Sequence, residues 1–558
     1  MSVNAGVDST LPESLIAQAQ RWAEQDVDPQ TAQELRDLIA RSSSDQAAMA
    51  ELRSAFAGPL AFGTAGLRGA LGPGPGRMNR VVVRRAAAGI ARYLQAHGGQ
   101  GGSLPSGDSR GGAVVIGYDA RHNSDVFAAD SAAILAGAGL RALMLPRPLP
   151  TPVLAYAIRA LGCAAGIMVT ASHNPAHDNG YKVYLADGSQ ITPPADAQIS
   201  AAIAQVSEFP VSELPMSDEW VTLGDDIEHE YIVQVVQTIL APLEPMDPGS
   251  LAARAAVRIV HTPLHGVGGS VFESVLATAG FTPPLRVAEQ FEPDPDFPTV
   301  SFPNPEEPGA MDAALALASA QHPDVVIAHD PDADRCAVAV PDRSGAWAML
   351  TGDDVGTLLA WWLIQHAFAG HVLAQSLVSC SLLERMAVSA GLAYRRTLTG
   401  FKWIGKVEGL RFGYEEALGY CVNPTMVRDK DGIAAGLAVA TIIAELKKSG
   451  RCVQDVLDDV ARRHGVFRTG QASIRVADLT RIGTIMATLR ADPPTAIAGT
   501  PVVRFIDLAQ GWDGLPGTDG LLFDLGDDNR VIIRPSGTEP KVKCYLQAVE
   551  SQGDTTLQ

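Results

Sequence analysis

The chain has 558 residues, too many for one hydrophobic core, so its length predicts about three to five domains. Hydrophobic residues make up 46% of the sequence and charged residues 19%, which is typical of folded globular proteins and excludes wholesale disorder. The formal net charge of -19 argues against a nucleic-acid partner, because no basic excess is present to neutralise a phosphate backbone, although a small phosphorylated ligand needs only a few local cations.

The N-terminal part, about residues 12–57, is predicted to be helical. Ala, Leu, Gln and Arg dominate there, and Asp28 and Pro29 supply an N-cap and a proline start for a second helix. The next segment, 62–80, contains too much glycine and proline for helix or strand, whereas 81–96 has a helical pattern. The composition of 97–112 predicts a flexible surface loop with no assigned role.

Strands and helices alternate after residue 112, which is typical of a parallel α/β sheet. The first unit has predicted strands at 113–119, 141–145 and 164–170, and predicted helices at 124–139 and 152–161. The alternation recurs at 256–269 and 324–340 and again over 370–401, where a helix is expected at 381–391. Past residue 466 the pattern changes to strand, helix and several strands, which predicts a C-terminal α+β unit.

The six cysteines are scattered, without CxxC spacing or a paired pattern, which predicts reduced thiols in a cytoplasmic protein. We expect no signal peptide, because the first residues lack a basic stretch followed by an apolar one. The most apolar run, "GTLLAWWLIQHAFAG", is interrupted by Gln and His and predicts a buried helix, so no membrane partner is expected. The oligomeric state has no signal in the sequence.

A serine follows the third predicted strand, in "VTASHNPAHDNGYKVY" at 169–184. The apolar run ends at Thr170, and Ser172 begins a polar cluster that contains Asn-Pro. This pattern is typical of a plain turn, and equally of a hydroxyl presented at a strand end.

Three aspartates alternate in "AHDPDADRCAV" at 328–338, directly after another predicted strand: Asp330, Asp332 and Asp334. Carboxylates about 4 Å apart repel one another by about 4 kcal/mol per pair at an effective dielectric of 20, so such a cluster needs a cation or raised pKa values. Oxygen ligands without His or Cys favour Mg²⁺ over Zn²⁺. A solvated acidic turn is the alternative.

Two further loops carry chemistry. Glu415 and Glu416 in "FGYEEALGY" follow a predicted strand and can accept hydrogen bonds from sugar hydroxyls, but on a strand only one of them faces a given ligand. "IIRPSGTEPKVKCY" places a guanidinium, hydroxyls and a glycine in one loop, which suits a phosphate. Either loop on its own is also consistent with a surface turn. Together with the serine and the aspartates, the four loops supply what phosphoryl transfer requires.

The chain resembles the α-D-phosphohexomutase superfamily, which includes phosphoglucomutase, phosphomannomutase and phosphopentomutase. "TASHNP", "DPDADR", "GYEEALGY" and "RPSGTEPK" match its four active-site loops in order and spacing, and "FGTAGLRG" is a fifth match. The resemblance covers about residues 58–548. It implies four domains around a central cleft, three similar mixed-sheet α/β units and a C-terminal α+β domain. We place an N-terminal helical extension at 1–57 and the four domains at 58–210, 211–341, 342–465 and 466–558.

The resemblance also implies roles for individual residues. Ser172 is expected to be the phosphoserine, with Mg²⁺ bound by one of its oxygens and by Asp330, Asp332 and Asp334. The cations and the histidine expected around the phosphoserine are Arg68, His173, Lys182 and Arg335, and Lys430 is expected to be a catalytic-site lysine. The sugar-contacting residues are expected to be Thr399, Gly400, Lys402, Glu415 and Glu416. The site for the non-reacting phosphate is expected at Arg534, Ser536, Gly537 and Thr538.

The expected activity is a Mg²⁺-dependent mutase that interconverts a sugar 1-phosphate and 6-phosphate, with a sugar 1,6-bisphosphate as activator. Glucose is the expected sugar, but Ala417 replaces the serine of the Glu-x-Ser pattern of many hexose-phosphate mutases, so mannose and a pentose stay open. An aspartyl phosphatase that uses "DPDAD" and a non-catalytic sugar-phosphate sensor are alternatives from other classes.

Overall fold

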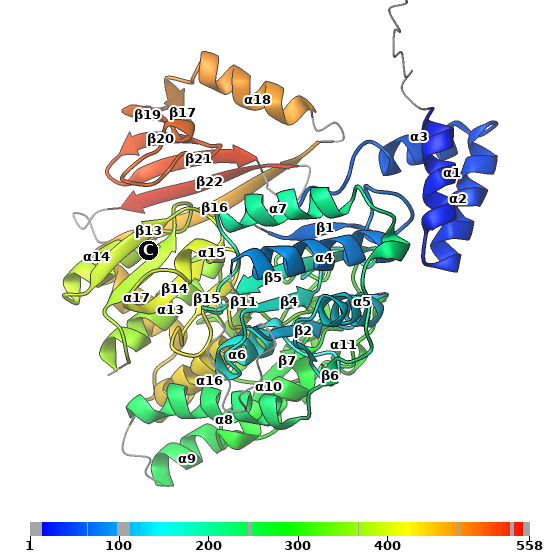
Figure 1. Cartoon of the computed structure of the whole chain (residues 1–558). Helices are drawn as coiled ribbons and strands as arrows, with labels where there is room; N and C mark the ends of the chain where they lie inside the picture. The colour runs from blue at the N-terminus through cyan, green and yellow to red at the C-terminus, as the bar shows by residue number, and fades with distance from the viewer. Residues whose placement is uncertain are drawn as a thin grey trace, which may run out of the picture.

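Three helices form the N-terminal extension, as expected for 12–57. The computed structural model describes residues 14–63, 65–97, 112–243, 248–366, 368–476, 480–535 and 541–550. The helices are α1 (Leu15–Gln25), α2 (Pro29–Ser42) and α3 (Gln46–Ala55), drawn in blue in Figure 1. The side chains of Ser14, Asp28 and Asp45 accept hydrogen bonds from the first backbone N–H groups of the three helices, which confirms the predicted Asp28 cap.

The first domain is built on a six-stranded sheet in the order β1-β5-β4-β2-β3-β6. Its strands are β1 (Leu67–Ala70), β2 (Val114–Tyr118), β3 (Ala142–Met144), β4 (Ala165–Val169), β5 (Asp178–Leu185) and β6 (Val221–Thr222). Its helices are α4 (Arg80–Ala96), α5 (Ser124–Gly137), α6 (Thr151–Ala160), α7 (Ala195–Val206) and the 3-10 turn η1 (Val211–Glu213). Strands β2, β3, β4 and β6 are parallel, and β5 and β1 add antiparallel strands at one edge.

Strand β1 corrects the expectation that 62–80 contains neither helix nor strand. It pairs with β5, with Leu67 opposite Tyr181. Gly66, just before it, has φ +76°, and a Cβ there would lie 1.8 Å from the carbonyl oxygen of Tyr181. Because Gly66 has no side chain, the backbone can come close to β5 at this point, and the pairing with β5 makes 67–70 a strand. The predicted loop at 97–112 lies outside the described residues except at its ends.

The second domain has a five-stranded sheet in the order β11-β10-β9-β7-β8. Its strands are β7 (Ile259–Thr262), β8 (Leu285–Arg286), β9 (Val325–Ala328), β10 (Ala337–Pro341) and β11 (Trp347–Met349). Its helical segments are α8 (Asp226–Leu240), η2 (Ala241–Leu243), α9 (Pro248–Ala255), α10 (Gly268–Thr278), α11 (Ala288–Phe291) and α12 (Asp312–Gln321). The third domain has four strands in the order β13-β12-β14-β15, namely β12 (Val372–Ser376), β13 (Ala393–Thr397), β14 (Leu410–Glu415) and β15 (Gly419–Cys421). Its helices are α13 (Gly352–Gln365), α14 (Leu382–Ser389), α15 (Phe401–Ile404), α16 (Gly432–Lys448) and α17 (Val453–His464).

The C-terminal domain is the orange and red sheet at the top of Figure 1, in the order β16-β22-β21-β20-β19 and antiparallel throughout. Its strands are β16 (Val466–Arg475), β19 (Arg504–Asp507), β20 (Leu521–Gly526), β21 (Asn529–Pro535) and β22 (Lys541–Glu550). It also contains α18 (Thr480–Ala491), the pair β17 (Ala496–Ile497) and β18 (Thr500–Pro501), and η3 (Leu508–Gln510). The predicted arrangement of three mixed-sheet α/β units and an α+β unit is confirmed.

Two short strands lie beyond the boundaries expected from the sequence. Strand β6 follows residue 210 but pairs with β3 of the first sheet, and β11 follows residue 341 but pairs with β10 of the second. Because strand pairing overrides the local change in composition, we propose boundaries after β6 and after β11.

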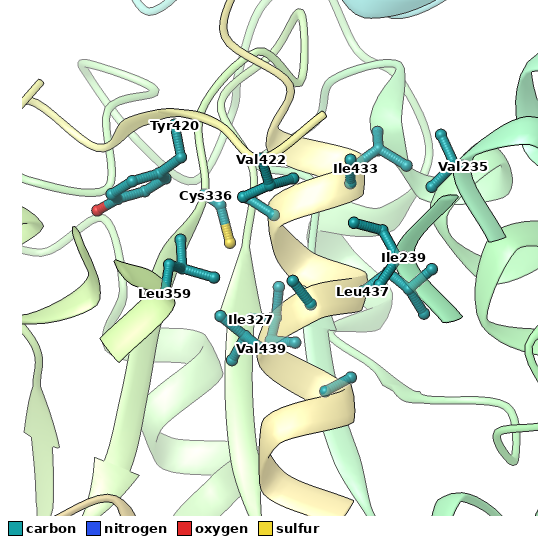
Figure 2. Packing of buried hydrophobic residues seen from close by; sticks show 14 of the residues in the cluster. Val235, Ile239, Ile327, Cys336, Leu359, Tyr420, Val422, Ile433, Leu437 and Val439 are labelled. Carbon is teal, nitrogen blue, oxygen red and sulfur yellow. The ribbon is translucent and has the colours of Figure 1, made fainter. Parts of the chain in front are cut away.

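Helix α16 joins the second and third domains in one core. Figure 2 shows its side chains Ile433, Leu437 and Val439 between Ile239 of α8 and Leu359 of α13. The shared packing holds the loop after β9, the turn after β14 and the start of α16 in fixed relation. Among the described residues, no helix is both long and apolar enough to cross a bilayer.

Candidate active site

Ser172 lies in the connection between β4 and β5, and its backbone is in the left-handed region with φ +52°. Its N–H donates to Thr170 Oγ1 at 2.8 Å, and its carbonyl accepts from Arg121 Nη2 at 2.6 Å. A non-glycine residue in this conformation costs about 1–2 kcal/mol, so these bonds offset the strain. They hold the Ser172 hydroxyl at the carboxyl end of the sheet.

Arg121 donates hydrogen bonds to the connection between β4 and β5 that carries Ser172, here called the serine loop. Besides Ser172, its guanidinium donates to the carbonyls of Asn174 at 2.5 Å and Pro175 at 2.8 Å. Asp119 Oδ2 lies 3.4 Å from Arg121 Nε, and the Phe297 ring centroid lies 4.9 Å from the guanidinium carbon. Our sequence reasoning missed Arg121. The available signal was an Asp-x-Arg at the carboxyl end of β2, which is the parallel neighbour of β4 and therefore ends at the same edge.

The three aspartates meet in the loop between β9 and β10. Oxygen atoms of Asp330, Asp332 and Asp334 all lie within 4.8 Å of one another. The turn is closed by the Ala333 N–H, which donates to the Asp330 carbonyl at 2.8 Å, and Ala333 has φ +54°. The Ser172 hydroxyl donates to Asp330 Oδ2 at 2.8 Å, across 158 positions of sequence.

Three cations face this acidic cluster. Lys182 Nζ lies 2.6 Å from Asp332 Oδ2 and 2.8 Å from Asp334 Oδ2, and Lys430 Nζ lies 3.1 Å from Asp334 Oδ2. Arg335 Nη1 lies 3.1 Å from Asp330 Oδ2 and donates to Ser172 Oγ at 2.8 Å. Burial by itself lowers the pKa of each lysine, but the carboxylates outweigh it and raise both pKa values above the ordinary value, so both stay protonated.

The aspartate cluster fits a hard divalent cation. Burial and the carboxylates of Asp332 and Asp334 raise the pKa of Asp330 to about 7, so the three carboxylates ionise fully only when a cation offsets their charge. Asp332 Oδ1 and Asp334 Oδ1 are buried and lack a hydrogen-bond partner within the described part of the chain. Carboxylate oxygens left unpaired beside one another are the donor set that Mg²⁺ prefers.

His173 and Arg68 belong to the same cluster. His173 Nδ1 accepts a hydrogen bond from Arg335 Nη1, and burial with the charges of Arg335 and Arg68 holds the pKa of His173 well below its usual value. The imidazole is therefore neutral. Arg68, on β1, donates to Asn174 Oδ1 at 3.0 Å and so contacts the serine loop.

The two adjacent glutamates point to different partners. Glu415 Oε1 accepts from the Gly400 N–H at 2.6 Å, which places it beside Thr399 and Lys402. Glu416 instead accepts from the hydroxyls of Ser376 at 3.1 Å and Ser379 at 2.9 Å. The structure therefore brings Glu415 to the expected sugar loop and turns the Glu416 carboxylate away from it.

The C-terminal domain contributes Arg534, at the end of β21. Its Nη1 donates to Thr399 Oγ1 of the third domain, so the expected phosphate arginine and the expected sugar loop are in contact. Ser536, Gly537 and Thr538 lie outside the described residues. Lys543 is directly opposite Arg534 in the β21–β22 pair, so both side chains are on one face of the sheet. Our sequence reasoning missed Lys543, although its place two residues after Lys541 on the return strand was available as a signal.

Models of the phosphoglucomutase/phosphomannomutase α/β/α domains I, II and III match residues 59–209, 237–345 and 351–463, and the C-terminal domain of that family matches 486–557. The structure of pp63/parafusin, a phosphoglucomutase from Paramecium in the open form, has the same fold, with a TM-score of 0.67 at 19% identity over 90% of this chain and 92% of that one.

Curated relatives align over most of the sequence. A protein of Haemophilus influenzae named "Probable phosphomannomutase" is 48% identical over 477 residues, which cover 84% of this chain and 93% of that protein. The human "Phosphopentomutase" is 32% identical over 579 aligned positions, which cover 96% of this chain and 91% of that protein. The chain belongs to the phosphoglucomutase/phosphomannomutase family of the α-D-phosphohexomutase superfamily, whose members are mutases that isomerise phosphorylated sugars.

Proposed function

We propose that this chain is a Mg²⁺-dependent mutase that interconverts a sugar 1-phosphate and 6-phosphate, with glucose 1-phosphate as the first substrate to test. The observation that carries the proposal is the Ser172 hydroxyl, which lies 2.8 Å from both an Asp330 carboxylate oxygen and the Arg335 guanidinium. A phosphoryl carrier needs a group that accepts its proton and a cation that stabilises its charge.

The proposed reaction consists of two phosphoryl transfers. Phosphorylated Ser172 gives its phosphoryl group to the sugar phosphate, the resulting bisphosphate reverses its orientation, and Ser172 accepts the phosphoryl group from the other position. Each transfer breaks one P–O bond and forms another, and one proton passes between the serine oxygen and the sugar oxygen. Asp330 Oδ2 accepts a hydrogen bond from the Ser172 hydroxyl and so contacts the oxygen that gains this proton in the first transfer and loses it in the second.

The surrounding charges have distinct proposed roles. Asp330, Asp332 and Asp334 would hold Mg²⁺ together with an oxygen of phosphoserine 172, and the ion would withdraw charge from the transferring group. Lys182 and Lys430, both protonated, stabilise negative charge on the same side. A sugar 1,6-bisphosphate is the proposed activator, because it supplies the phosphoryl group for Ser172.

The remaining residues bind the sugar and its second phosphate. We assign Glu415 to the sugar hydroxyls, with the nearby residues Thr399, Gly400 and Lys402. Arg534, with Ser536, Gly537 and Thr538, is assigned to the non-reacting phosphate. The contact between Arg534 and Thr399 supports this assignment, because the two parts of one sugar phosphate have to be bound by neighbouring groups.

The test is a pair of serine variants. Ser172→Ala should abolish turnover of glucose 1-phosphate in the presence of Mg²⁺ and glucose 1,6-bisphosphate. Ser189→Ala is the matched control, because Ser189 is also a buried serine of the first domain whose hydroxyl donates to a carboxylate, Asp187, at 2.7 Å. Activity near the wild-type level in the Ser172→Ala variant contradicts the proposal, as does phosphate label on an aspartate, which would indicate an aspartyl phosphatase. Ligand binding without any turnover would indicate a sensor.

A pentose phosphate is the second candidate substrate. Ala417 offers no hydroxyl to a hexose, and the human phosphopentomutase aligns with 96% of this chain. Values of kcat/KM for the 1-phosphates of glucose, mannose and ribose decide between the sugars. A preference for ribose or mannose 1-phosphate would change the sugar assigned as substrate but would leave the proposed mutase chemistry intact.

A further inference from the structure

The segment from Ser376 to Ser381, here called the support segment, connects β12 to α14 in the third domain. Ser376 and Ser379 are fully buried within it. One side of the support segment contacts the turn that carries Glu415, and the other side contacts the C-terminal domain that carries Arg534. It therefore lies between the two elements that we assign to substrate binding.

The support segment binds Glu416 on the side that faces the turn between β14 and β15, here called the sugar turn because it carries Glu415. The Ser379 hydroxyl donates to Glu416 Oε2 at 2.9 Å, and the Glu416 N–H donates back to Ser379 Oγ at 3.1 Å. Ser376 Oγ adds a third bond, to Glu416 Oε2 at 3.1 Å. Hydrogen bonds from hydroxyls to a carboxylate are among the stronger hydrogen bonds, so these contacts restrict the movement of Glu416 and its neighbour Glu415.

On its opposite side, Ser379 contacts the C-terminal domain. The Ser379 carbonyl accepts from Arg530 Nη2 at 2.6 Å, in a buried contact. Arg530 and Arg534 are four residues apart on β21, so they lie on one face of the strand, roughly 13 Å apart along it. Ser379 thus holds the strand whose end carries Arg534.

Further contacts keep the two domains docked without Ser379. Leu377 and Val378 of the support segment pack with Leu522, Ile532 and Tyr545 of the C-terminal domain. The N–H of Ser381 donates to Gln547 Oε1 at 2.9 Å, and Gln547 Nε2 donates to Ser381 Oγ at 2.7 Å. Removing the Ser379 hydroxyl should therefore shift the sugar turn relative to β21 without separating the domains.

We infer that Ser379 is a positioning residue that sets the distance between Glu415 and Arg534. Its hydroxyl binds Glu416 and so positions the turn that carries Glu415. Its carbonyl binds Arg530 and so positions β21, the strand that ends near Arg534. The inference rests on the proposed function, which assigns the sugar to Glu415 and the second phosphate to Arg534. A ligand that has both groups gains affinity from correct spacing, whereas a ligand that has one of them does not.

The experiment compares a linked ligand with one of its parts. Calorimetry on the full-length, dephosphorylated protein gives the dissociation constants of glucose 1-phosphate and of inorganic phosphate. Ser379→Ala should weaken glucose 1-phosphate binding about tenfold, because two hydrogen bonds to Glu416 are lost, and change inorganic phosphate binding by less than about twofold. Ser381→Ala is the control, with less than about a twofold change for both ligands, since its N–H still binds Gln547.

A second pair of variants tests the same link from the sugar turn. Glu416→Gln keeps an oxygen that accepts from Ser379 and should bind glucose 1-phosphate within about threefold of the wild type, whereas Glu416→Met lacks the acceptor and should match Ser379→Ala. Equal weakening of both ligands in Ser379→Ala, or no weakening of either, overturns the inference and leaves the mutase assignment standing. A wild-type protein that binds glucose, mannose and ribose 1-phosphates no more tightly than inorganic phosphate overturns the proposed function and the inference together.

Discussion

Replacing Arg121 should slow the phosphorylation of Ser172, although Arg121 is not assigned to contact the substrate. The guanidinium supplies hydrogen bonds to four carbonyls of the serine loop, those of Ser172, Asn174, Pro175 and Asp178. Losing only the two shortest leaves two buried carbonyls unpaired, at about 1–3 kcal/mol each. That penalty exceeds the about 1–2 kcal/mol that the left-handed conformation of Ser172 costs, so the loop should relax to another conformation.

The assay is the single-turnover rate of Ser172 phosphorylation by glucose 1,6-bisphosphate. A displacement of about 1 Å reduces such a rate by about 100-fold, and we expect this loss in Arg121→Met. Arg121→Met also leaves the buried Asp119 without its cation, which costs about 3–5 kcal/mol and should lower the melting temperature. Arg121→Lys keeps a positive charge beside Asp119 and should retain more of the stability, yet it cannot span the carbonyls and should lose most of the rate.

Arg159 provides a matched control. It too is an arginine that donates to three successive carbonyls, those of Pro424, Thr425 and Met426, but it does not contact the serine loop. Arg159→Met should leave Ser172 phosphorylation within about threefold of the wild-type rate. A wild-type rate in Arg121→Met, or an equal loss in Arg159→Met, would refute the reasoning.

Three further predictions concern charge. Removal of divalent cations should abolish turnover, and Mg²⁺ should restore it. Asp332→Ala should raise the Mg²⁺ concentration for half-maximal activity at least tenfold. Unchanged turnover in excess chelator contradicts the assigned metal site. Lys430→Met should lower kcat about 100-fold with little change in KM, because its ammonium group, 3.1 Å from Asp334, is placed to stabilise the charge that develops during transfer. An effect confined to KM argues against this role. Burial raises the pKa of Asp353 from 3.8 to about 6, so its protonated form favours the folded state below pH 3.8 and this contribution is lost as the pH rises through 6. Asp353→Asn should therefore gain about 2 kcal/mol in free energy of unfolding relative to the wild type between pH 4 and 6, measured by denaturation across that range, and a pH-independent difference contradicts the assignment.

Short-range chemistry made several elements predictable from the sequence. The Asp28–Pro29 start of α2 follows from capping, which involves only a few neighbouring residues. The positions of Ser172 and of the three aspartates at strand ends follow from apolar runs that stop abruptly before polar turns. The tendency of the aspartates to bind a cation also follows locally, since three carboxylates brought together at alternate positions need either a cation or raised pKa values.

Long-range pairing decided what the sequence left open. Strand β1 exists because β5 pairs with a glycine-rich segment, and β6 and β11 join sheets on the far side of the boundaries that composition predicts. The direction of Glu416 depends on Ser376 and Ser379, which reach it from the end of another strand.

The sequence by itself determined which groups this protein offers for the proposed phosphoryl transfer: a hydroxyl, a cluster of carboxylates, an acid assigned to the sugar and an arginine loop. Only the tertiary structure decided that Ser172 lies 2.8 Å from Asp330, that Arg121 holds the serine loop, and that Ser379 contacts both Glu416 and Arg530. The physical reason is range. Residue type and strand period act over a few positions, whereas contacts across 158 or 151 positions depend on how sheets and helices pack.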